Sequence, residues 1–291
     1  MVNWVPEKTE DGSFTFFSEE FQEMFHSRMG AKTEAFEKFA EITDLAQRAK
    51  SSHIKLLDVC FGLGYNTAAA IETIWSANPN CHIEVYGLEI DATVPQAAIL
   101  PPLIDSWSPP VKEILTKLAL DNRCVEEKIK AELLIGDARQ TIETLVKNDF
   151  KADAIFFDPF SPKTCPQLWT VEFFEKVTKC LAIAGKLTTY SRSASVRRAM
   201  QNAGLYIGTI PLGENHLPHE WSLGTVGCFN PQTLHPLSPM ELEHLQTRAS
   251  VPFRDPKLTD TAEEIVKRHR QEQEICQLES TSSWRRRWNI T

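Results

Sequence analysis

The sequence predicts an α/β protein built on a doubly wound, largely parallel sheet. Short apolar runs near residues 54–59, 82–89, 131–135, 153–157 and 185–190 alternate with segments of helical pattern. A glycine-punctuated turn follows the first run, and an acidic residue lies at the end of each of the first four. Such alternation is typical of a parallel sheet with helices on both faces, and ligands bind at the carboxyl ends of its strands. We therefore expect a ligand site where the four acids meet.

The turn after the first strand has the features of a nucleotide-cofactor loop. Gly62 and Gly64 allow unusual backbone dihedrals and a close approach of the chain to a ligand. The helix expected over about residues 65–75 would present free backbone N–H groups at its start. Glu89 ends the second run, at the place where an acid holds the ribose hydroxyl groups of a cofactor. Together these positions predict a site for a nucleotide-containing cofactor.

The class of cofactor follows from what the loop lacks. A dinucleotide fingerprint requires a third glycine three residues after Gly64, and Thr67 stands there instead. Asp58, just before the loop, would repel a pyrophosphate but suits a cationic or amino group. Asp137, followed by Ala138, ends the third run and is suited to hydrogen-bond an adenine amine. This set favours S-adenosylmethionine, although each acid taken alone could simply cap a helix or a loop.

The fourth run ends in Asp158-Pro159-Phe160, which predicts the reacting group. Methyl transfer from a sulfonium requires the acceptor to be held near the methyl group. The Asp158 carboxylate can accept a hydrogen bond from an acceptor amine and stabilise the positive charge that develops on nitrogen. Phe160 can lie against a flat substrate such as a base, and Tyr190, at the end of the fifth run, can line the same pocket. In the alternative interpretation, Asp158 caps a turn and Phe160 is a core ring.

Composition and charge are those of a cytoplasmic enzyme. The chain has 291 residues, a net charge of −8 and seven cysteines without a Cys-x-x-Cys pair. Scattered cysteines indicate reduced thiols, and no apolar run approaches the roughly 20 residues of a membrane span. The amino terminus lacks the basic and apolar parts of a signal peptide. The negative charge argues against a general nucleic-acid binder, and no membrane partner is expected.

Basic residues nevertheless gather in the second part of the chain. Arg192, Arg197 and Arg198 follow the fifth run, and residues 284–288 read Trp-Arg-Arg-Arg-Trp. Arginines flanked by tryptophans can bind phosphate and stack on bases, and a solvated tail is the alternative. No metal site is predicted, because His216 and His219 have no third ligand at a suitable spacing.

Three regions are expected along the chain. Residues 1–50 form an amino-terminal extension that packs on the core, with a strand at 13–17 and a helix at 32–50. Residues 51–230 form the core, with an insertion at 91–130, a helix near 111–120 and a terminal antiparallel strand pair at 205–210 and 221–229. Residues 231–291 form a helical carboxyl-terminal extension, in which capping boxes at residues 238–241 and 261–264 mark the starts of two helices.

Several segments resemble the methyltransferase part of the MnmC family. They are the loop 61–66, the run 156–162 with Leu168-Trp169, the segment 185–191 with Val196-Arg197-Arg198 and Ala203-Gly204, and the amino-terminal residues 16–18 through Gly30 and Glu34. The resemblance covers roughly residues 10–230. It implies a Rossmann-like class I methyltransferase fold, S-adenosylmethionine as the methyl donor, and the aminomethyl group of the wobble uridine of tRNA as the acceptor. It also implies residue roles: Asp58, Gly62, Gly64, Asn66, Glu89 and Asp137 would bind the cofactor, and Asp158 would lie beside the acceptor amine.

The chain departs from that family in three ways. Cys60 stands where many methyltransferases have the first loop glycine, and residues 213–220 lack the basic side chains expected against tRNA. No fingerprint of the family's flavin-dependent oxidoreductase is present, so no FAD is expected and another enzyme must supply the aminomethyl group. A methyltransferase acting on a small-molecule or protein amine, an aminopropyltransferase of similar fold and a non-catalytic binding scaffold are the alternatives. No obligatory protein partner is inferred.

Overall fold

The computed structural model describes residues 4–212 and 221–290, and the chain divides into two compact units. The first unit comprises Met1–Phe160 and Cys180–Thr188, and the second comprises Ser161–Lys179 and Thr189–Thr291. The segment 213–220, with His216 and His219, lies outside the described residues. The region boundaries expected at residues 50 and 230 remain predictions.

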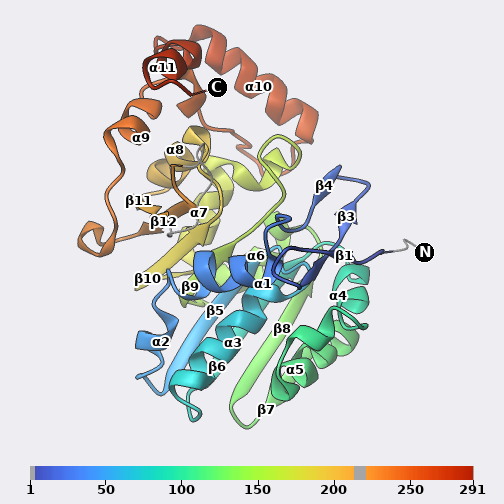
Figure 1. The fold of residues 1–291 in the computed structure, drawn as a ribbon. Coiled ribbons are helices and arrows are strands. Elements are labelled where there is room, and N and C mark those ends of the chain that lie inside the picture. The colour runs from blue at the N-terminus through green and yellow to red at the C-terminus, as the bar shows by residue number, and fades with distance from the viewer. Residues whose placement is uncertain (1–3, 213–220, 291) are drawn as a thin grey trace. The chain divides into compact units, whose positions relative to one another are not determined.

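A largely parallel sheet forms the centre of the first unit (Figure 1). The strands of the sheet that belong to this unit lie in the order β10-β9-β5-β6-β8-β7. The pairs β5–β6, β6–β8, β5–β9 and β9–β10 are parallel, and only β7 runs antiparallel, to β8. The bounds are β5 His53–Val59, β6 His82–Glu89, β7 Arg123–Glu126, β8 Ile129–Ile135, β9 Ala152–Phe157 and β10 Leu181–Thr189. Within this sheet the chain passes from β5 outward through β6 to the edge strands β7 and β8 and then crosses back to β9 on the other side of β5. The strand order therefore reverses between β5 and β9, where ligands of such sheets bind. This confirms the predicted doubly wound, Rossmann-like α/β fold.

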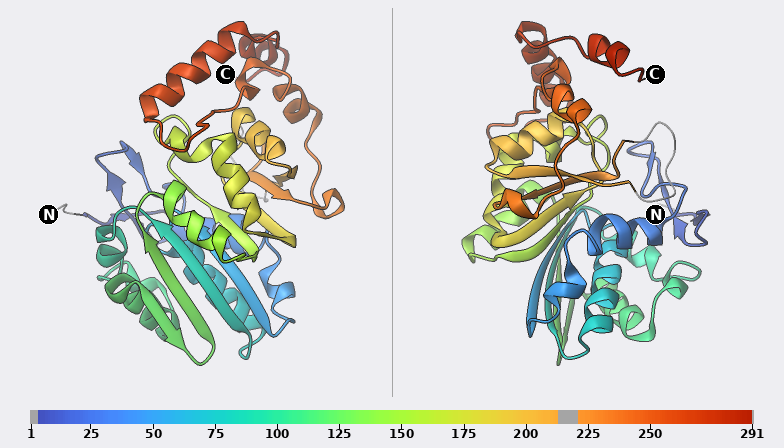
Figure 2. Two further views of the ribbon diagram at one scale, coloured as in Figure 1. Left: turned by 180° about the vertical axis from the view of Figure 1, so that it is seen from behind. Right: turned by 60° about the vertical axis from the view of Figure 1, so that its left-hand side comes forward.

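Helices cover both faces of this sheet. The helices α3 (Tyr65–Ala77) and α5 (Pro109–Asp121) lie on the face toward the viewer in Figure 1, and α6 (Ala138–Lys147) lies on the other face, seen in Figure 2. The helix α4 (Thr93–Ala98) and the short 3-10 helix η2 (Ile104–Ser106) precede α5. The central strands β5 and β9 are largely buried on both faces, and three side chains of β5, those of Leu56, Leu57 and Val59, have no exposed surface. Full burial explains why these strands read as continuous apolar runs in the sequence.

The amino-terminal segment differs from the prediction of one strand and one helix. Four two-residue strands come first: β1 Glu7–Lys8, β2 Phe14–Thr15, β3 Phe17–Ser18 and β4 Glu23–Met24. The predicted helix at 32–50 is broken into α1 (Ala31–Glu34), a π-helical segment η1 (Ala35–Ala40) and α2 (Leu45–Arg48). Asp44 causes the second break, because its φ of 59° is left-handed and a helix cannot continue through such a residue.

The second unit is mainly helical around one antiparallel strand pair. The strands β11 (Tyr206–Ile210) and β12 (Gly224–Cys228) pair antiparallel, which confirms the predicted terminal pair. The helices are α7 Val171–Lys179, α8 Ala194–Asn202, α9 Pro239–His244, α10 Ala262–Ile275 and α11 Thr281–Arg287, with 3-10 turns η3 Pro166–Trp169, η4 Pro231–Thr233 and η5 Arg248–Ser250. Both predicted capping boxes are present, at the starts of α9 and α10.

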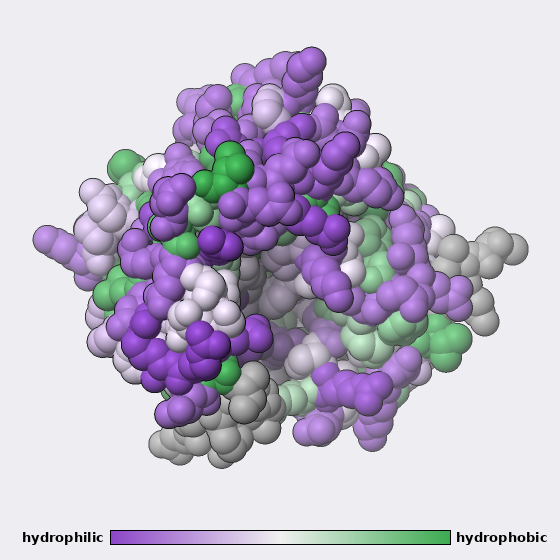
Figure 3. Space-filling model, turned by 90° about the horizontal axis from the view of Figure 1, so that it is seen from above, coloured by the Kyte–Doolittle hydropathy of each residue, from purple (hydrophilic) through white to green (hydrophobic). Residues whose placement is uncertain are grey.

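The carboxyl-terminal helices present a polar face to solvent. Hydrophilic residues cover most of the end of the second unit that carries α10 and α11 (Figure 3). The first tryptophan of the segment 284–288 does not belong to this surface, because Trp284 is buried and its indole N–H donates to the Met240 carbonyl. Trp284 is therefore a core residue and is not available to stack on a base. Among the described residues, no helix combines the length and apolar character needed to cross a bilayer.

Candidate active site

The loop between β5 and α3 passes through three residues with positive φ. They are Cys60 at 69°, Gly62 at 55° and Gly64 at 78°. A Cβ on Gly64 would lie 2.8 Å from the Phe61 ring and 3.0 Å from Leu115, so this position needs glycine for its dihedral and for its packing. Cys60 has the same left-handed backbone with a side chain, at a cost of about 1–2 kcal/mol. The strained backbone therefore lies at Cys60, the position at which many methyltransferases have the first glycine of the loop.

Glu89 ties the end of β6 to this loop. One carboxylate oxygen accepts the Gly62 N–H at 2.7 Å, and the other accepts the N–H groups of Ile90 and Asp91 at 2.8 and 2.9 Å. Burial raises the pKa of this carboxyl above its usual value, against the effect of these hydrogen bonds. The oxygen that receives only the Gly62 N–H keeps a lone pair for a further donor. Glu89 can therefore hold the loop and still accept a hydrogen bond from a ligand hydroxyl.

Asp58 lies fully buried beside the start of α3. Its Oδ2 accepts a hydrogen bond from the Thr67 hydroxyl at 2.7 Å, whereas its Oδ1 has no partner among the described residues. Burial raises the pKa of Asp58 well above its usual value, and the nearby Asp158 and Glu89 carboxylates add to the rise. Thr67 thus has a role that we did not predict: it occupies the position of a missing third glycine and holds the acid of the loop. A buried oxygen without a partner is suited to a donor group of a bound ligand.

Asp137 and Ala138 lie at the end of β8 and the start of α6. Asp137 is the N-cap of α6, accepting the Arg139 N–H at 2.9 Å, and it also pairs with the Arg139 guanidinium at 2.7 Å. The adjoining Gly136 donates its N–H to the Glu89 carbonyl at 2.8 Å, which brings this turn beside the end of β6. Ala138 is the first residue of α6, so its N–H has no acceptor within the helix. The acid is therefore a helix cap, as the alternative interpretation allowed, and the turn still places an N–H donor at the strand ends.

Asp158 follows β9 and meets Asn66 from the start of α3. The Asn66 amide donates to Asp158 Oδ2 at 2.9 Å, and the Asp158 N–H donates to the Val59 carbonyl at 3.1 Å. The structure thus brings together a predicted cofactor residue and the predicted catalytic residue. Burial raises the pKa of Asp158 to about 7 against the opposing Asn66 hydrogen bond, and the Glu34 carboxylate adds to the rise. A carboxyl with a pKa near neutrality can take up and release a proton at physiological pH.

Phe160 belongs to an aromatic cluster with the amino-terminal segment. Its ring stacks on Phe21 at a centroid distance of 4.5 Å and contacts the edge of Phe25 at 4.9 Å. Phe25 also lies over the glycine loop, because a Cβ on Gly62 would be 3.4 Å from its ring. One face of Phe160 is therefore covered by Phe21, which leaves less of the ring for a flat substrate than the sequence suggested. Neither Phe21 nor Phe25 was identified from the sequence, since both lie far from the loop along the chain.

Tyr190 belongs to the second unit, where its ring contacts the edge of Trp169 at 6.0 Å. Its predicted place in the substrate pocket stays a prediction.

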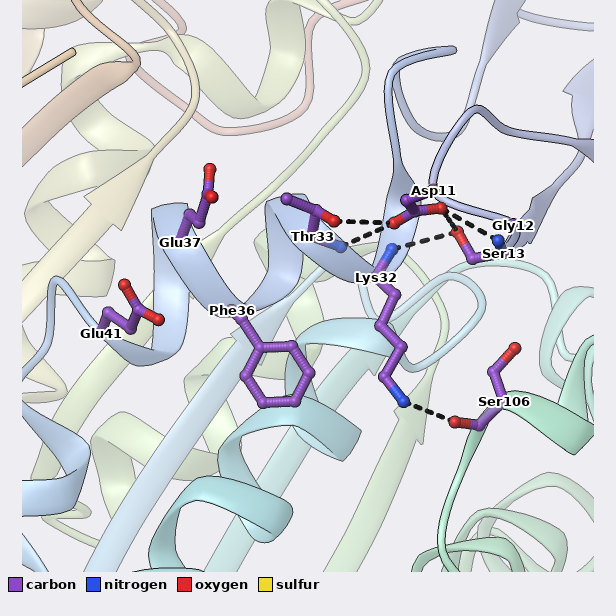
Figure 4. Close-up of a pocket in the computed structure, with 9 residues that line it drawn as sticks. All are labelled: Asp11, Gly12, Ser13, Lys32, Thr33, Phe36, Glu37, Glu41 and Ser106. Atoms are coloured by element: carbon purple, nitrogen blue, oxygen red, sulfur yellow. Dashed lines mark hydrogen bonds between the residues drawn. The ribbon is translucent and has the colours of Figure 1, made fainter. Parts of the chain in front are cut away.

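A pocket of about 480 Å³ opens elsewhere in the first unit (Figure 4). It contains none of the predicted site residues and is lined by Asp11, Gly12, Ser13, Lys32, Thr33, Phe36, Glu37, Glu41 and Ser106. Its polar groups largely satisfy one another: Asp11 accepts from Thr33 and Ser13, and the Lys32 ammonium donates to the Ser106 carbonyl. Within the described part of the chain, no three His, Cys, Asp or Glu side chains gather as metal ligands would.

The groups at the strand ends fit S-adenosylmethionine. The unpartnered Asp58 oxygen, the close backbone turn at Gly62 and Gly64, and the remaining lone pair of Glu89 supply acceptors and space for a ligand that carries an amino group and ribose hydroxyls. A pyrophosphate would meet several carboxyl groups here and would be repelled.

The sequence is similar to a methyltransferase family model and to several proteins. A family model described as S-adenosyl-L-methionine-dependent methyltransferase matches residues 101–213. An uncharacterized protein of Methanocaldococcus jannaschii is 32% identical over 212 residues, which cover 69% of this chain and 54% of that protein. The tRNA 5-methylaminomethyl-2-thiouridine biosynthesis bifunctional protein MnmC of Polaromonas naphthalenivorans is 26% identical over 220 residues, 72% of this chain and 34% of that protein. The chain therefore spans about half the length of the first relative and a third of the second.

A solved structure extends the similarity to nearly the whole fold. The crystal structure of MnmC2 from Aquifex aeolicus superposes with a TM-score of 0.80 at 28% identity, covering 95% of this chain and 87% of that one. The match includes the doubly wound sheet and the segments before and after it. The chain is an S-adenosylmethionine-dependent methyltransferase of the MnmC type.

Proposed function

We propose that the chain transfers a methyl group to the 5-aminomethyl group of the wobble uridine in tRNA. The observation that carries the proposal is the hydrogen bond from the Asn66 amide to Asp158 beside the glycine loop, because a carboxyl with a pKa of about 7 can take a proton from an amine acceptor. The MnmC relatives are named for the biosynthesis of 5-methylaminomethyl-2-thiouridine in tRNA, which supports this acceptor. A tRNA acceptor would place the reaction in the cytoplasm.

Residues of the first unit would hold the donor. Gly62 and Gly64 would let the backbone approach it, and Asp58 Oδ1 would accept from its amino group. Glu89 would accept from the ribose hydroxyl groups through its remaining lone pair, and the Asp137–Ala138 turn would face the adenine. When bound, S-adenosylmethionine supplies a methyl group on a positively charged sulfur.

Asp158 would act on the acceptor nitrogen. At neutral pH an alkyl amine is mostly an ammonium ion, which has no lone pair with which to attack a methyl group. A carboxylate in a water-poor site can take one proton from that nitrogen and stabilise its charge as the new bond forms. Asn66 would keep Asp158 Oδ2 in one orientation while Oδ1 faces the acceptor. Phe160 would line the acceptor side of the site.

The test is a transfer assay with defined tRNA. The protein is incubated with labelled S-adenosylmethionine and tRNA that carries the 5-aminomethyl wobble uridine, and the digested nucleosides are identified by mass spectrometry. We expect a labelled methylaminomethyl uridine, no product from tRNA with an unmodified uridine, and a rate lower by about 10- to 1000-fold for Asp158→Asn. Donor binding without any transfer to the tRNA would refute the acceptor, and an unchanged rate in Asp158→Asn would remove Asp158 from the mechanism.

A further inference from the structure

A π-helical turn lies over the strand ends that carry Asp158. In η1 the Glu41 N–H donates to the Phe36 carbonyl, five residues earlier, at 2.9 Å. The turn is fastened to the sheet at two points: the Thr188 hydroxyl of β10 donates to the Lys38 carbonyl at 2.7 Å, and the Phe39 ring meets the Phe156 ring of β9 edge-on. Phe156 is two residues before Asp158. Single π-turns inside helices occur frequently at functional sites.

This turn carries a largely buried ion pair. The Glu34 carboxylate accepts a hydrogen bond from the Lys38 ammonium, and each side chain is only 17% exposed. The other Glu34 oxygen accepts the Ser27 N–H at 3.0 Å, which fixes the carboxylate from the amino-terminal segment. An ion pair removed from water contributes little net stability, because desolvation offsets the attraction. The position of the Glu34–Lys38 ion pair is therefore better explained by the charges that it places near the strand ends than by a contribution to the stability of the fold.

The charges of this pair act on Asp158. The Glu34 carboxylate raises the pKa of Asp158 and the Lys38 ammonium lowers it, beyond the larger effect of burial. On the other elements packed around Asp158, β5 contributes the buried Asp58 carboxyl and α3 the neutral amide of Asn66. On the far side of the pair lies the half-buried His26 imidazole, whose pKa is lowered by burial and raised by the Glu34 and Asp11 carboxylates. Glu34 and Lys38 thus form an opposed pair of charges beside the predicted proton acceptor.

We infer that Glu34 and Lys38 are positioning residues of the methyl-transfer site, which set the charge of the Asp158 carboxyl and so the pH range in which it can take a proton from the acceptor amine. The inference rests on the proposed role of Asp158. In the reaction one proton passes from the acceptor ammonium to the Asp158 carboxylate, and the freed nitrogen lone pair then attacks the methyl group, whose bond to the donor sulfur breaks with its electron pair left on sulfur. Asp158 then returns the proton to solvent. Only the ionised carboxyl can accept the proton, so the pair controls the acidic limb of the rate profile.

The first measurement follows Asp158 directly and needs no acceptor. Protein with ¹³C-labelled aspartate is titrated by NMR, and the Asp158 signal is assigned from its loss in Asp158→Asn. Glu34→Gln removes a negative charge, so the midpoint of the Asp158 titration should fall by about one pH unit, and Lys38→Met should raise it by about as much. Lys38→Arg keeps the charge and should restore the original midpoint. Glu37→Gln is the matched control, because Glu37 is exposed on the same turn and lines the separate pocket in Figure 4.

The second measurement is the pH dependence of kcat on the aminomethyl tRNA. The acidic limb should move in the same opposed directions in Glu34→Gln and Lys38→Met, a result that a loss of folding alone does not produce. Midpoints that stay in place, or that move in the same direction in both variants, would overturn the inference. If the NMR midpoints move as expected but no tRNA is methylated, the proposed acceptor fails and the charge-setting role stands. If tRNA is methylated and the midpoints do not move, the role fails and the proposed function stands.

Discussion

At the scale of residues, the side chains of Asn66 and Asp158 form a hydrogen-bonded pair at the strand ends. Asn66 was predicted to bind the cofactor, yet its amide donates to Asp158 Oδ2 at 2.9 Å. Asn66→Leu keeps the size of the side chain and removes the donor. Because this hydrogen bond lowers the pKa of Asp158, its loss should raise that pKa above 7, move the acidic limb of kcat to higher pH and lower the rate at pH 7 by about tenfold.

The affinity for the donor distinguishes a role of Asn66 in binding the cofactor from its role as the hydrogen-bond partner of Asp158. Isothermal calorimetry with S-adenosylhomocysteine should give nearly the same Kd for Asn66→Leu and the wild-type protein. A Kd weakened by tenfold or more, with the acidic limb of the rate profile in place, would return Asn66 to the cofactor site and contradict the pairing as its main role.

The sequence predicted which residues lie at the strand ends but not what they contact. Asp58, Glu89 and Asp158 could be placed because an apolar run that ends in an acid is a local pattern, and parallel strands end at one edge of a sheet. Their partners come from elsewhere: Thr67 binds Asp58, and the Gly62 N–H binds Glu89. No local pattern encodes these contacts, since they depend on how separate segments pack.

Among the larger elements, helix starts were predictable and helix breaks were not. The capping boxes of α9 and α10 follow from four adjacent residues each, and both are present. The helix expected at 32–50 is instead interrupted by the π-turn η1 and by Asp44. Neither break has a proline or glycine to mark it. Tertiary contacts such as the Thr188 hydroxyl on the Lys38 carbonyl accompany the π-turn, and these lie 150 residues apart in sequence.

The two capping boxes allow a matched test at the scale of helices. Glu241 caps α9 and also pairs with Arg197 at 2.7 Å, with both side chains fully buried. Glu264 plays the same capping role in α10 but is exposed. Glu241→Ala leaves the Arg197 guanidinium buried without its carboxylate, so it should lower the free energy of unfolding by about 3–5 kcal/mol. Glu264→Ala loses only a cap, at about 1 kcal/mol.

Urea unfolding followed by tryptophan fluorescence measures both variants, because Trp284 and Trp221 lie in the same unit as α9. Equal losses in the two variants would mean that the Arg197–Glu241 pair adds nothing beyond the cap. The pair also bears on the sequence interpretation: Arg197 was counted among the basic residues of the second part of the chain, and its full burial removes it from any surface that tRNA could touch.

For the whole molecule, the division into two units predicts which segments a bound donor stabilises. The residues proposed to hold S-adenosylmethionine all lie in the first unit, whereas α9, α10 and α11 lie in the second. A ligand that binds only the folded state stabilises it by RT ln(1 + [L]/Kd), about 2.7 kcal/mol at a hundredfold excess over Kd. S-adenosylhomocysteine should therefore slow amide hydrogen exchange in peptides that span residues 60–67, 88–91 and 136–139. Peptides from α9–α11 serve as the internal control and should exchange at unchanged rates. Protection confined to the second unit would contradict the placement of the donor at the ends of β5, β6 and β8. The variant Glu89→Ala should lose most of the protection, because it lacks both the acceptor for the ribose hydroxyl groups and the carboxylate that binds the Gly62 N–H of the glycine loop.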